Sequence, residues 1–179
     1  MNKLFKTLSL LAAMAFFAIA CSPQIAQAAP GAASYQGMLG KSVSDQDVAN
    51  FIVSNDCTQS GAFQLCRPAG LALWTDADRV VKTAYLYLQS TDGFAAYKGE
   101  LPLGLVSNDT MASVEYKLGG LKEVHAPQAG WEPGLPDEGS SPDHMHYWAI
   151  YKRFGMTVIY NSPSGNDKDA TIDAILVSK

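Results

Sequence analysis

The sequence predicts an α+β fold of two tandem units, each a helix plus an antiparallel sheet, and a pair of similar hairpins is the main observation behind this. Residues 155–178 contain an apolar strand that begins at a glycine, a polar turn and a second apolar strand. Residues 70–88 are a weaker copy in the same order. A basic residue stands three positions before each glycine, Arg67 in one copy and Lys152 in the other. Because a unit that cannot bury its own apolar face stacks on its neighbour, two copies predict one shared core.

The first unit, residues 38–98, is expected to begin with a helix. Ser44 is the expected N-cap, and Asp47 follows three residues later as in a capping box. One face of this helix is apolar and carries Val48, Phe51 and Ile52. A short alternating run at 62–66 predicts a strand that leads into the first hairpin.

The second unit, residues 99–179, follows a turn-rich connection in which a short helical turn is expected at 94–97. Ser107 or Asn108 is expected to cap its helix, and Gly119 with the next glycine supplies the left-handed stop. The apolar face of this helix carries Met111, Val114 and Leu118. Both units therefore share the order helix, strand, hairpin.

A family resemblance rests on the second unit. The helical run TMASVEYKLG at 110–119, followed by the aromatic strand at 147–151 and a glycine-initiated hairpin, resembles the unit of small exported bacterial proteins of the BamE/SmpA type. Two such units in tandem are similar to the β-lactamase inhibitor protein fold, which implies paired helices over one face of a sheet. The run ELPLGL at 100–105 resembles immunity proteins that neutralise bacterial toxins. These matches involve caps, glycines and core positions, so they imply a fold and transfer no binding residue.

The N-terminus, residues 1–28, is typical of a secretory signal peptide. Lys3 and Lys6 form a positive region, and the apolar run at 8–20 is short for a membrane-spanning helix. The mature chain is therefore expected outside the cytoplasm, in the periplasm.

Two cleavage sites compete within this signal. Residues 26–28 fit the small-x-small rule and favour soluble release, whereas 18–21 resemble a bacterial lipobox with alanine where leucine is usual. Lipidation of Cys21 would anchor the protein to the outer membrane. In either case residues 29–37 form a linker of small and polar residues before the fold.

The two cysteines that remain, Cys57 and Cys66, are close in sequence and predict a disulfide in an oxidising compartment. The short loop that they close would stabilise the fold by ~2–3 kcal/mol by restricting the unfolded chain. The alternative is a reactive thiol, which would need a nearby base, and no histidine is close in sequence.

The two units differ in one segment. The second has 21 more residues between Gly104 and Gly155 than the first has between Gly40 and Gly70, and they correspond to an inserted loop at 125–145. Proline and glycine are too frequent in this segment for a helix or a sheet strand. Long loops of this kind in compact domains are often functional.

The composition of the loop suits contact with a protein partner. Trp131 is a large rigid anchor, and prolines lower the entropy cost of holding one shape. Negative charge is concentrated at Glu132, Asp137, Glu138 and Asp143. The sequence therefore predicts that these residues bind a toxin or an envelope enzyme, and the alternative is a lid in which Trp131 packs on the sheet edge.

The three histidines flank the same loop. His144 and His146 share one side of an extended chain, and with His125 they could bind a divalent metal. Structural zinc sites usually have four ligands, and the cysteines are assigned to a disulfide. Surface histidines are the stronger interpretation, and neither a metal nor a cofactor is predicted.

Charge and motifs limit the function. The net charge of −4 and the pI near 5.2 argue against nucleic acid and anionic lipid as partners, so a membrane contact is expected only if Cys21 is lipidated. The sequence contains no Gly-x-Ser-x-Gly, His-Glu-x-x-His or phosphate-loop motif. We therefore predict an exported non-enzymatic binding protein, an inhibitor or immunity protein. The alternative is a structural or assembly lipoprotein tethered to the outer membrane.

Overall fold

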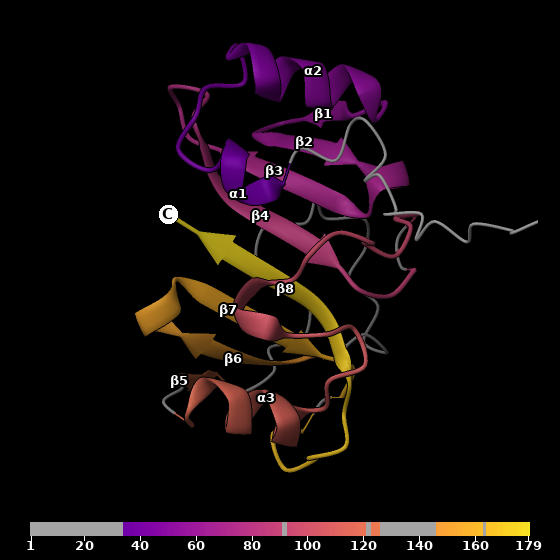
Figure 1. Ribbon diagram of the computed structural model, residues 1–179, viewed down its shortest axis with the longest axis vertical. Helices are drawn as coiled ribbons and strands as arrows, with labels where there is room; N and C mark the ends of the chain where they lie inside the picture. Colours follow the sequence, from indigo (N-terminus) through magenta and orange to yellow (C-terminus); the bar gives the residue numbers. More distant parts are fainter. Residues whose placement is uncertain (1–33, 91–92, 121–122, 126–145, 163) are drawn as a thin grey trace, which may run out of the picture. The chain divides into compact units, whose positions relative to one another are not determined.

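An antiparallel sheet of eight strands forms the centre of the fold (Figure 1). The structure is a computed structural model, and it describes residues 34–90, 93–120, 123–125, 146–162 and 164–179. The strands are β1 (Thr58–Ser60), β2 (Phe63–Cys66), β3 (Leu71–Thr75), β4 (Val81–Tyr87), β5 (Glu123–His125), β6 (Tyr147–Tyr151), β7 (Met156–Tyr160) and β8 (Ile172–Ser178). The helices are α1 (Tyr35–Met38), α2 (Gln46–Ser54) and α3 (Met111–Leu118), and the short 3-10 helices are η1 (Arg67–Ala69), η2 (Pro102–Gly104) and η3 (Lys152–Phe154).

The strands follow the order β1-β2-β3-β4-β8-β7-β6-β5, and every neighbouring pair is antiparallel. The elements from α2 to β4 occur in the order helix, two strands, 3-10 helix, two strands, and the elements from α3 to β8 occur in the same order. β4 and β8 join these two runs at the middle of the sheet, where Tyr85 is the register partner of Leu176 (Figure 1). The predicted α+β class is confirmed, and the sheet is continuous.

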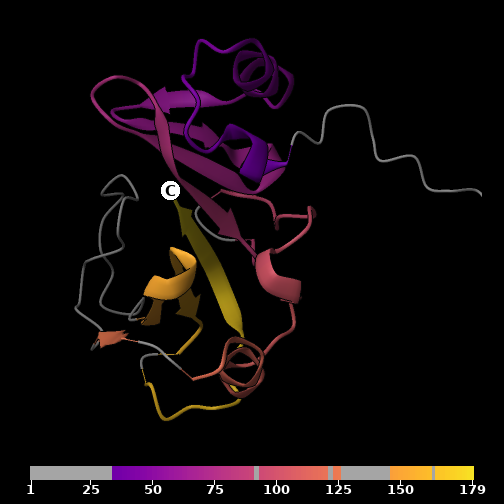
Figure 2. The ribbon, with the colours of Figure 1, turned by 60° about the vertical axis from the view of Figure 1, so that its left-hand side comes forward.

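The side chains on the two faces of the sheet form two separate apolar clusters, because successive side chains along a strand point to opposite faces. The larger cluster includes the helices, and α1 and α3 lie on the same side of β8 (Figure 2). The helices contribute Tyr35, Met38, Val48, Phe51, Met111, Val114 and Leu118 to this cluster. The cluster on the other face contains Leu65, Ala72, Tyr85, Tyr87, Phe94, Trp148, Ile159, Ala174 and Leu176.

The two glycines that begin the predicted hairpins are needed for their backbone shape. Gly70 ends η1 and Gly155 ends η3, and both have left-handed φ angles, of 69° and 57°. A side chain at Gly70 would meet the Ala95 carbonyl oxygen at 2.3 Å, and one at Gly155 would meet the Ser178 carbonyl oxygen at 2.7 Å. The similarity seen in the sequence therefore corresponds to a similar turn before β3 and before β7.

The helix starts differ from the predicted ones. The N-cap of α2 is Asp45 rather than Ser44, and Asp47 forms an ion pair with Lys41 instead of closing a capping box. The N-cap of α3 is Thr110, which forms a reciprocal capping box with Ser113. Thr110 takes the place of the two earlier candidates, Ser107 and Asn108, because the chain before it is held in a turn by Asp109. The predicted stop at Gly119 is confirmed, with a left-handed φ of 79°.

Two strands were not predicted, and one predicted helical turn is absent. β1 and β5 are three-residue edge strands, and such short runs carry no usable alternation of polar and apolar residues. Residues 94–97 contain no helical turn, because Phe94 stacks on Tyr87 with ring centroids 4.1 Å apart. The Ala95 and Tyr97 amides donate instead to the carbonyl oxygens of Arg67 and Tyr87. Among the residues that the structure describes, no helix has the length and apolar character needed to cross a membrane.

Candidate functional site

The predicted recognition loop connects two paired strands at one edge of the sheet. β5 is the last strand of the sheet, and its final residue, His125, is the register partner of Trp148 on β6. The chain therefore leaves and re-enters the sheet at adjacent positions. The predicted contact residues themselves, Trp131, Glu132, Asp137, Glu138 and Asp143, lie outside the described residues.

The structure describes two of the three histidines, His125 and His146. His125 ends β5, His144 lies outside the described residues, and His146 directly precedes β6. His146 Nδ1 is 3.6 Å from Asp173 Oδ2 on β8 and 3.3 Å from the Tyr160 carbonyl oxygen. Within the described part of the chain, no group of three or more His, Cys, Asp or Glu side chains is placed to hold a metal ion.

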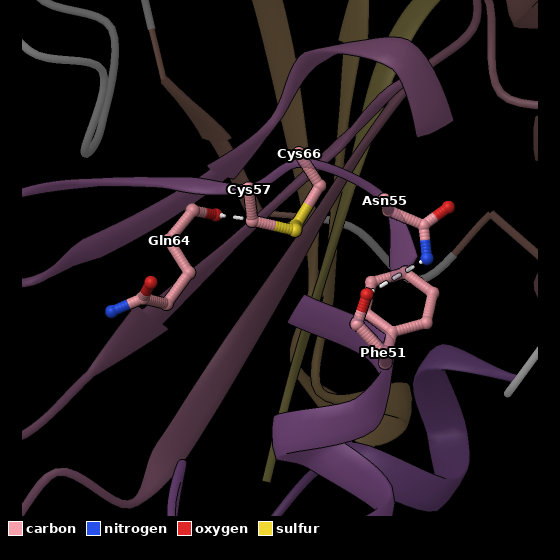
Figure 3. The surroundings of a disulfide bond; sticks show 5 residues. All are labelled: Phe51, Asn55, Cys57, Gln64 and Cys66. Carbon is pink, nitrogen blue, oxygen red and sulfur yellow. Dashed lines mark hydrogen bonds between the residues drawn. A yellow bond between two sulfur atoms is a disulfide. The ribbon is translucent and has the colours of Figure 1, made fainter. Parts of the chain in front are cut away.

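The predicted disulfide between Cys57 and Cys66 is present (Figure 3). Their Cα atoms are 4.1 Å apart, and the next residues along the ladder, Thr58 and Leu65, are register partners in β1 and β2. The Cys57 amide also donates to the Ile52 carbonyl oxygen in the last turn of α2. The disulfide therefore ties the end of α2 and the edge strand β1 to the inner sheet, which is a structural role.

A second surface was missed by the sequence analysis. Four large apolar or aromatic side chains are strongly exposed among the described residues: Val53 (76%), Leu103 (51%), Val106 (48%) and Tyr116 (90%). Three of them lie on η2, the turn after it and α3, and η2 stands on the same side of the sheet as α3 (Figure 2). We call Leu103 and Val106 the η2 surface. Its signal in the sequence is the run LPLGLV at 101–106, which has more apolar residues than one turn can bury.

Leu103 has an unfavourable backbone conformation. Its φ and ψ angles of 56° and 29° lie in the left-handed region, and Gly104 follows with a φ of 71°. For a residue with a Cβ atom this conformation costs about 1 kcal/mol or more. The turn therefore holds an apolar side chain in solvent at a cost in backbone energy.

Asp109 anchors the chain beside this turn. The residue is only 6% exposed, and its Oδ2 accepts hydrogen bonds from the Val106 amide at 2.8 Å and from Lys117 Nζ at 2.7 Å. Its Oδ1 accepts a further hydrogen bond from Ser113 Oγ at 2.8 Å. Burial disfavours the charged carboxylate, but the hydrogen bonds from Lys117, Val106 and Ser113 outweigh burial and lower the pKa of Asp109.

A hollow of about 460 Å³ lies next to the η2 surface. Its lining includes Leu88, Tyr97, Glu100, Leu101, Leu105 and Val106. The Tyr97 ring packs over Gly99, where an added side chain would meet the tyrosine oxygen at 2.2 Å, and it lies edge-on to Tyr35. Burial and the nearby Glu100 carboxylate raise the pKa of Tyr97, so its hydroxyl is neutral at physiological pH. The wall of the hollow therefore combines apolar side chains with the charged side chains of Lys98 and Glu100.

The chain matches no protein-family model, no curated protein and no solved structure. No residue role is therefore transferred from a relative. The surfaces described above are the basis on which a function can be proposed.

Proposed function

We propose that this chain is an exported, non-enzymatic binding protein, an inhibitor or immunity protein that blocks the active site of a toxin or envelope enzyme. The observation that carries this proposal is the position of the acidic, tryptophan-bearing segment between β5 and β6, two paired strands at the edge of an eight-stranded sheet. Binding residues are disproportionately found on loops that a rigid scaffold positions. Trp131 is the central anchor in this account, and Glu132, Asp137, Glu138 and Asp143 steer a basic partner toward it.

The two runs of elements are, in this proposal, tandem copies of one unit, as in the β-lactamase inhibitor protein fold. The shared element order and the glycine-capped turns before β3 and β7 support the duplication. The copies differ in the connection between their first two strands. Gly61 and Ala62 join β1 to β2, whereas residues 126–146, which include the acidic, tryptophan-bearing segment, join β5 to β6. A long connection at only one of two equivalent positions indicates an addition for function rather than for folding.

The proposed location is the periplasm, after cleavage of the signal peptide. The disulfide between Cys57 and Cys66 supports an oxidising compartment, because cysteine pairs are kept reduced in the cytosol.

A second candidate function is a structural or assembly lipoprotein tethered to the outer membrane. The observation that favours it is that Cys21 is the single cysteine of the chain outside the disulfide, and it lies in the lipobox-like run. An acyl chain on Cys21 would leave residues 22–33 as a tether before the first described element. Globomycin treatment separates the two candidates, since it blocks the processing of lipoprotein precursors and leaves other exported proteins unaffected.

The test of the inhibitor proposal is a protection assay against the toxin or lytic enzyme encoded beside the gene. Cells that produce the wild-type chain should survive exposure, and cells that produce Trp131→Ala should not, at equal periplasmic levels of the two proteins. A matched control is Trp74→Phe, which changes a half-buried sheet tryptophan and should protect like the wild type. Equal protection by Trp131→Ala, or no protection by the wild type, would contradict the proposal.

A further inference from the structure

We propose that the hollow beside η2 is a binding site for a small zwitterion with an aliphatic side chain, namely a free α-amino acid such as leucine. Lys98 binds its carboxylate, Glu100 binds its ammonium group, and an apolar floor holds its side chain. The site lies in the connection between the two runs of elements and does not involve the segment between β5 and β6. It therefore stands whether or not the inhibitor proposal is correct.

The floor of the hollow is apolar and fixed in shape. Leu88 follows β4, and Leu101 and Leu105 flank η2; all three line the hollow and are buried. Because the rest of the fold already covers most of each side chain, their positions do not depend on a ligand. The volume of about 460 Å³ lies within the range of about 300–1,000 Å³ that small-molecule pockets occupy. The hollow is therefore large enough to seat one amino acid against an apolar surface.

Two side chains of opposite charge stand at the rim. Lys98 and Glu100 are exposed, and both line the hollow. In the part of the chain that the structure describes, neither side chain forms an ion pair or a hydrogen bond. Lys117, on the nearby helix α3, is by contrast paired with Asp109. The charges of Lys98 and Glu100 thus remain available for a ligand that has both a negative and a positive group.

The Tyr97 hydroxyl is a third polar group at the rim. A side chain added at Gly99 would collide with Tyr97 Oη, so the hydroxyl lies against the backbone between Lys98 and Glu100. Burial and the nearby Glu100 carboxylate raise the pKa of Tyr97, so the hydroxyl keeps its proton and can donate it to a ligand carboxylate. Small-molecule sites combine an apolar lining with a few such polar groups. A neutral ligand would leave both charges unused, whereas a zwitterion uses both.

Both walls of the hollow are held by hydrogen bonds. The Tyr97 amide donates to the Tyr87 carbonyl oxygen at 2.7 Å, which fixes the wall that carries the charges. Lys117 Nζ donates to the Gly104 carbonyl oxygen at 3.1 Å, which fixes the wall formed by η2. A preformed site loses little conformational entropy on binding, so a ligand with few atoms can still bind to it.

The first test titrates the full mature protein with four probes that differ mainly in charge: L-leucine, leucine amide, N-acetyl-leucine and N-acetyl-leucine amide. In amide NMR spectra, L-leucine should give saturable shifts confined to residues 88 and 97–107. The two singly charged probes should each bind about tenfold more weakly, through loss of one hydrogen bond to a charged group. The uncharged probe and L-glutamate, which lacks an aliphatic side chain, should give no saturable shifts. A singly charged probe that binds as tightly as L-leucine, or no saturable shifts with L-leucine, would overturn the proposal.

Paired variants assign each charge of the ligand to its partner. Lys98→Gln should weaken L-leucine binding about tenfold and leave leucine amide binding unchanged, because that probe has no carboxylate. Glu100→Gln should weaken L-leucine binding by a similar factor and leave N-acetyl-leucine binding unchanged, because that probe has no ammonium group. Lys152→Gln and Asp167→Asn, the controls, remove exposed charges elsewhere and should leave L-leucine binding unchanged. All four side chains are exposed, so the melting midpoints should match that of the wild type. Equal losses in the variants and the controls would contradict the site.

Discussion

Lys117 on α3 forms an ion pair with Asp109, which precedes the helix, and its Nζ is 2.7 Å from Asp109 Oδ2. The Asp109 side chain is almost fully buried. The same carboxylate accepts hydrogen bonds from the Val106 amide and from Ser113 Oγ. The pair therefore links the start of α3, its last turn and the chain after η2. Replacing Asp109 by asparagine would remove the charge that pairs with Lys117 and one of the two oxygens that accept from Val106, Ser113 and Lys117.

The Asp109→Asn variant should be less stable than the wild type by ~1–3 kcal/mol at pH 7 in urea unfolding, because a charged acceptor is lost. The folded-state pKa of Asp109 is lowered, so its stabilisation is complete above the unfolded value of about 3.9 and is lost as the pH falls through the folded value. The difference between variant and wild type should therefore shrink below about pH 4. Asp167→Asn, at an exposed carboxylate, is the control. A gap that does not depend on pH would contradict this role of Asp109.

Two glycines with left-handed φ angles provide a second matched comparison. Gly70→Ala should cost ~3 kcal/mol or more, because the added methyl group meets the Ala95 carbonyl oxygen at 2.3 Å and the Tyr97 amide nitrogen at 2.5 Å. Gly61→Ala should cost only about 1 kcal/mol, since its φ is also left-handed but nothing lies within 4 Å of the new atom. Urea midpoints measure both. Similar losses in the two variants would show that the segment at 95–97 does not pack on Gly70.

The glycine turns and the disulfide could be predicted from the sequence, because each depends on a residue type that few other structural roles require. The turns at Gly70 and Gly155 were recognisable because a left-handed backbone in tight contact requires glycine. The disulfide was recognisable because two cysteines this close in sequence have few other uses in a chain that is expected to be exported.

Other features depend on contacts across the fold and could not be predicted. Ser107 and Asn108 suit an N-cap locally, but Asp109 holds their neighbours in a turn, and Thr110 becomes the cap. The exposure of Leu103 and Val106 was not predicted, because Leu101 and Leu105 in the same short apolar run are buried and the sequence pattern does not distinguish the two kinds. Leu103 is about half exposed, and its backbone is in the left-handed region.

The disulfide should stabilise the folded state by ~2–3 kcal/mol, as expected for a short closed loop. The double variant Cys57→Ala with Cys66→Ala should lower the urea midpoint accordingly, and wild-type protein in a strong reductant should behave in the same way. The lost stability should leave the rest of the sheet intact, because the bond ties down only the edge strand β1 and the end of α2. An unchanged midpoint under reduction would contradict this structural role.

The acidic residues of the loop should act on the rate of association. Replacing Glu132, Asp137 and Glu138 together by the corresponding amides should slow binding of the partner enzyme or toxin and flatten the dependence of the rate on salt, because rim charges steer encounter more than they hold a complex. Stopped-flow mixing at several ionic strengths measures both effects. The dissociation rate should change little. A change confined to dissociation would place these side chains at the centre of the interface instead.

The most direct test of the recognition loop is thermal melting and partner binding of Trp131→Ala. If Trp131 is the anchor of the interface, the variant should melt like the wild type and lose ~2–4 kcal/mol of binding free energy. If Trp131 is instead packed on the sheet as a lid, its removal should lower the free energy of unfolding by ~3 kcal/mol or more. An unchanged melting midpoint with strongly weakened binding is the result that we predict. A large fall in the midpoint with binding unchanged would contradict the account.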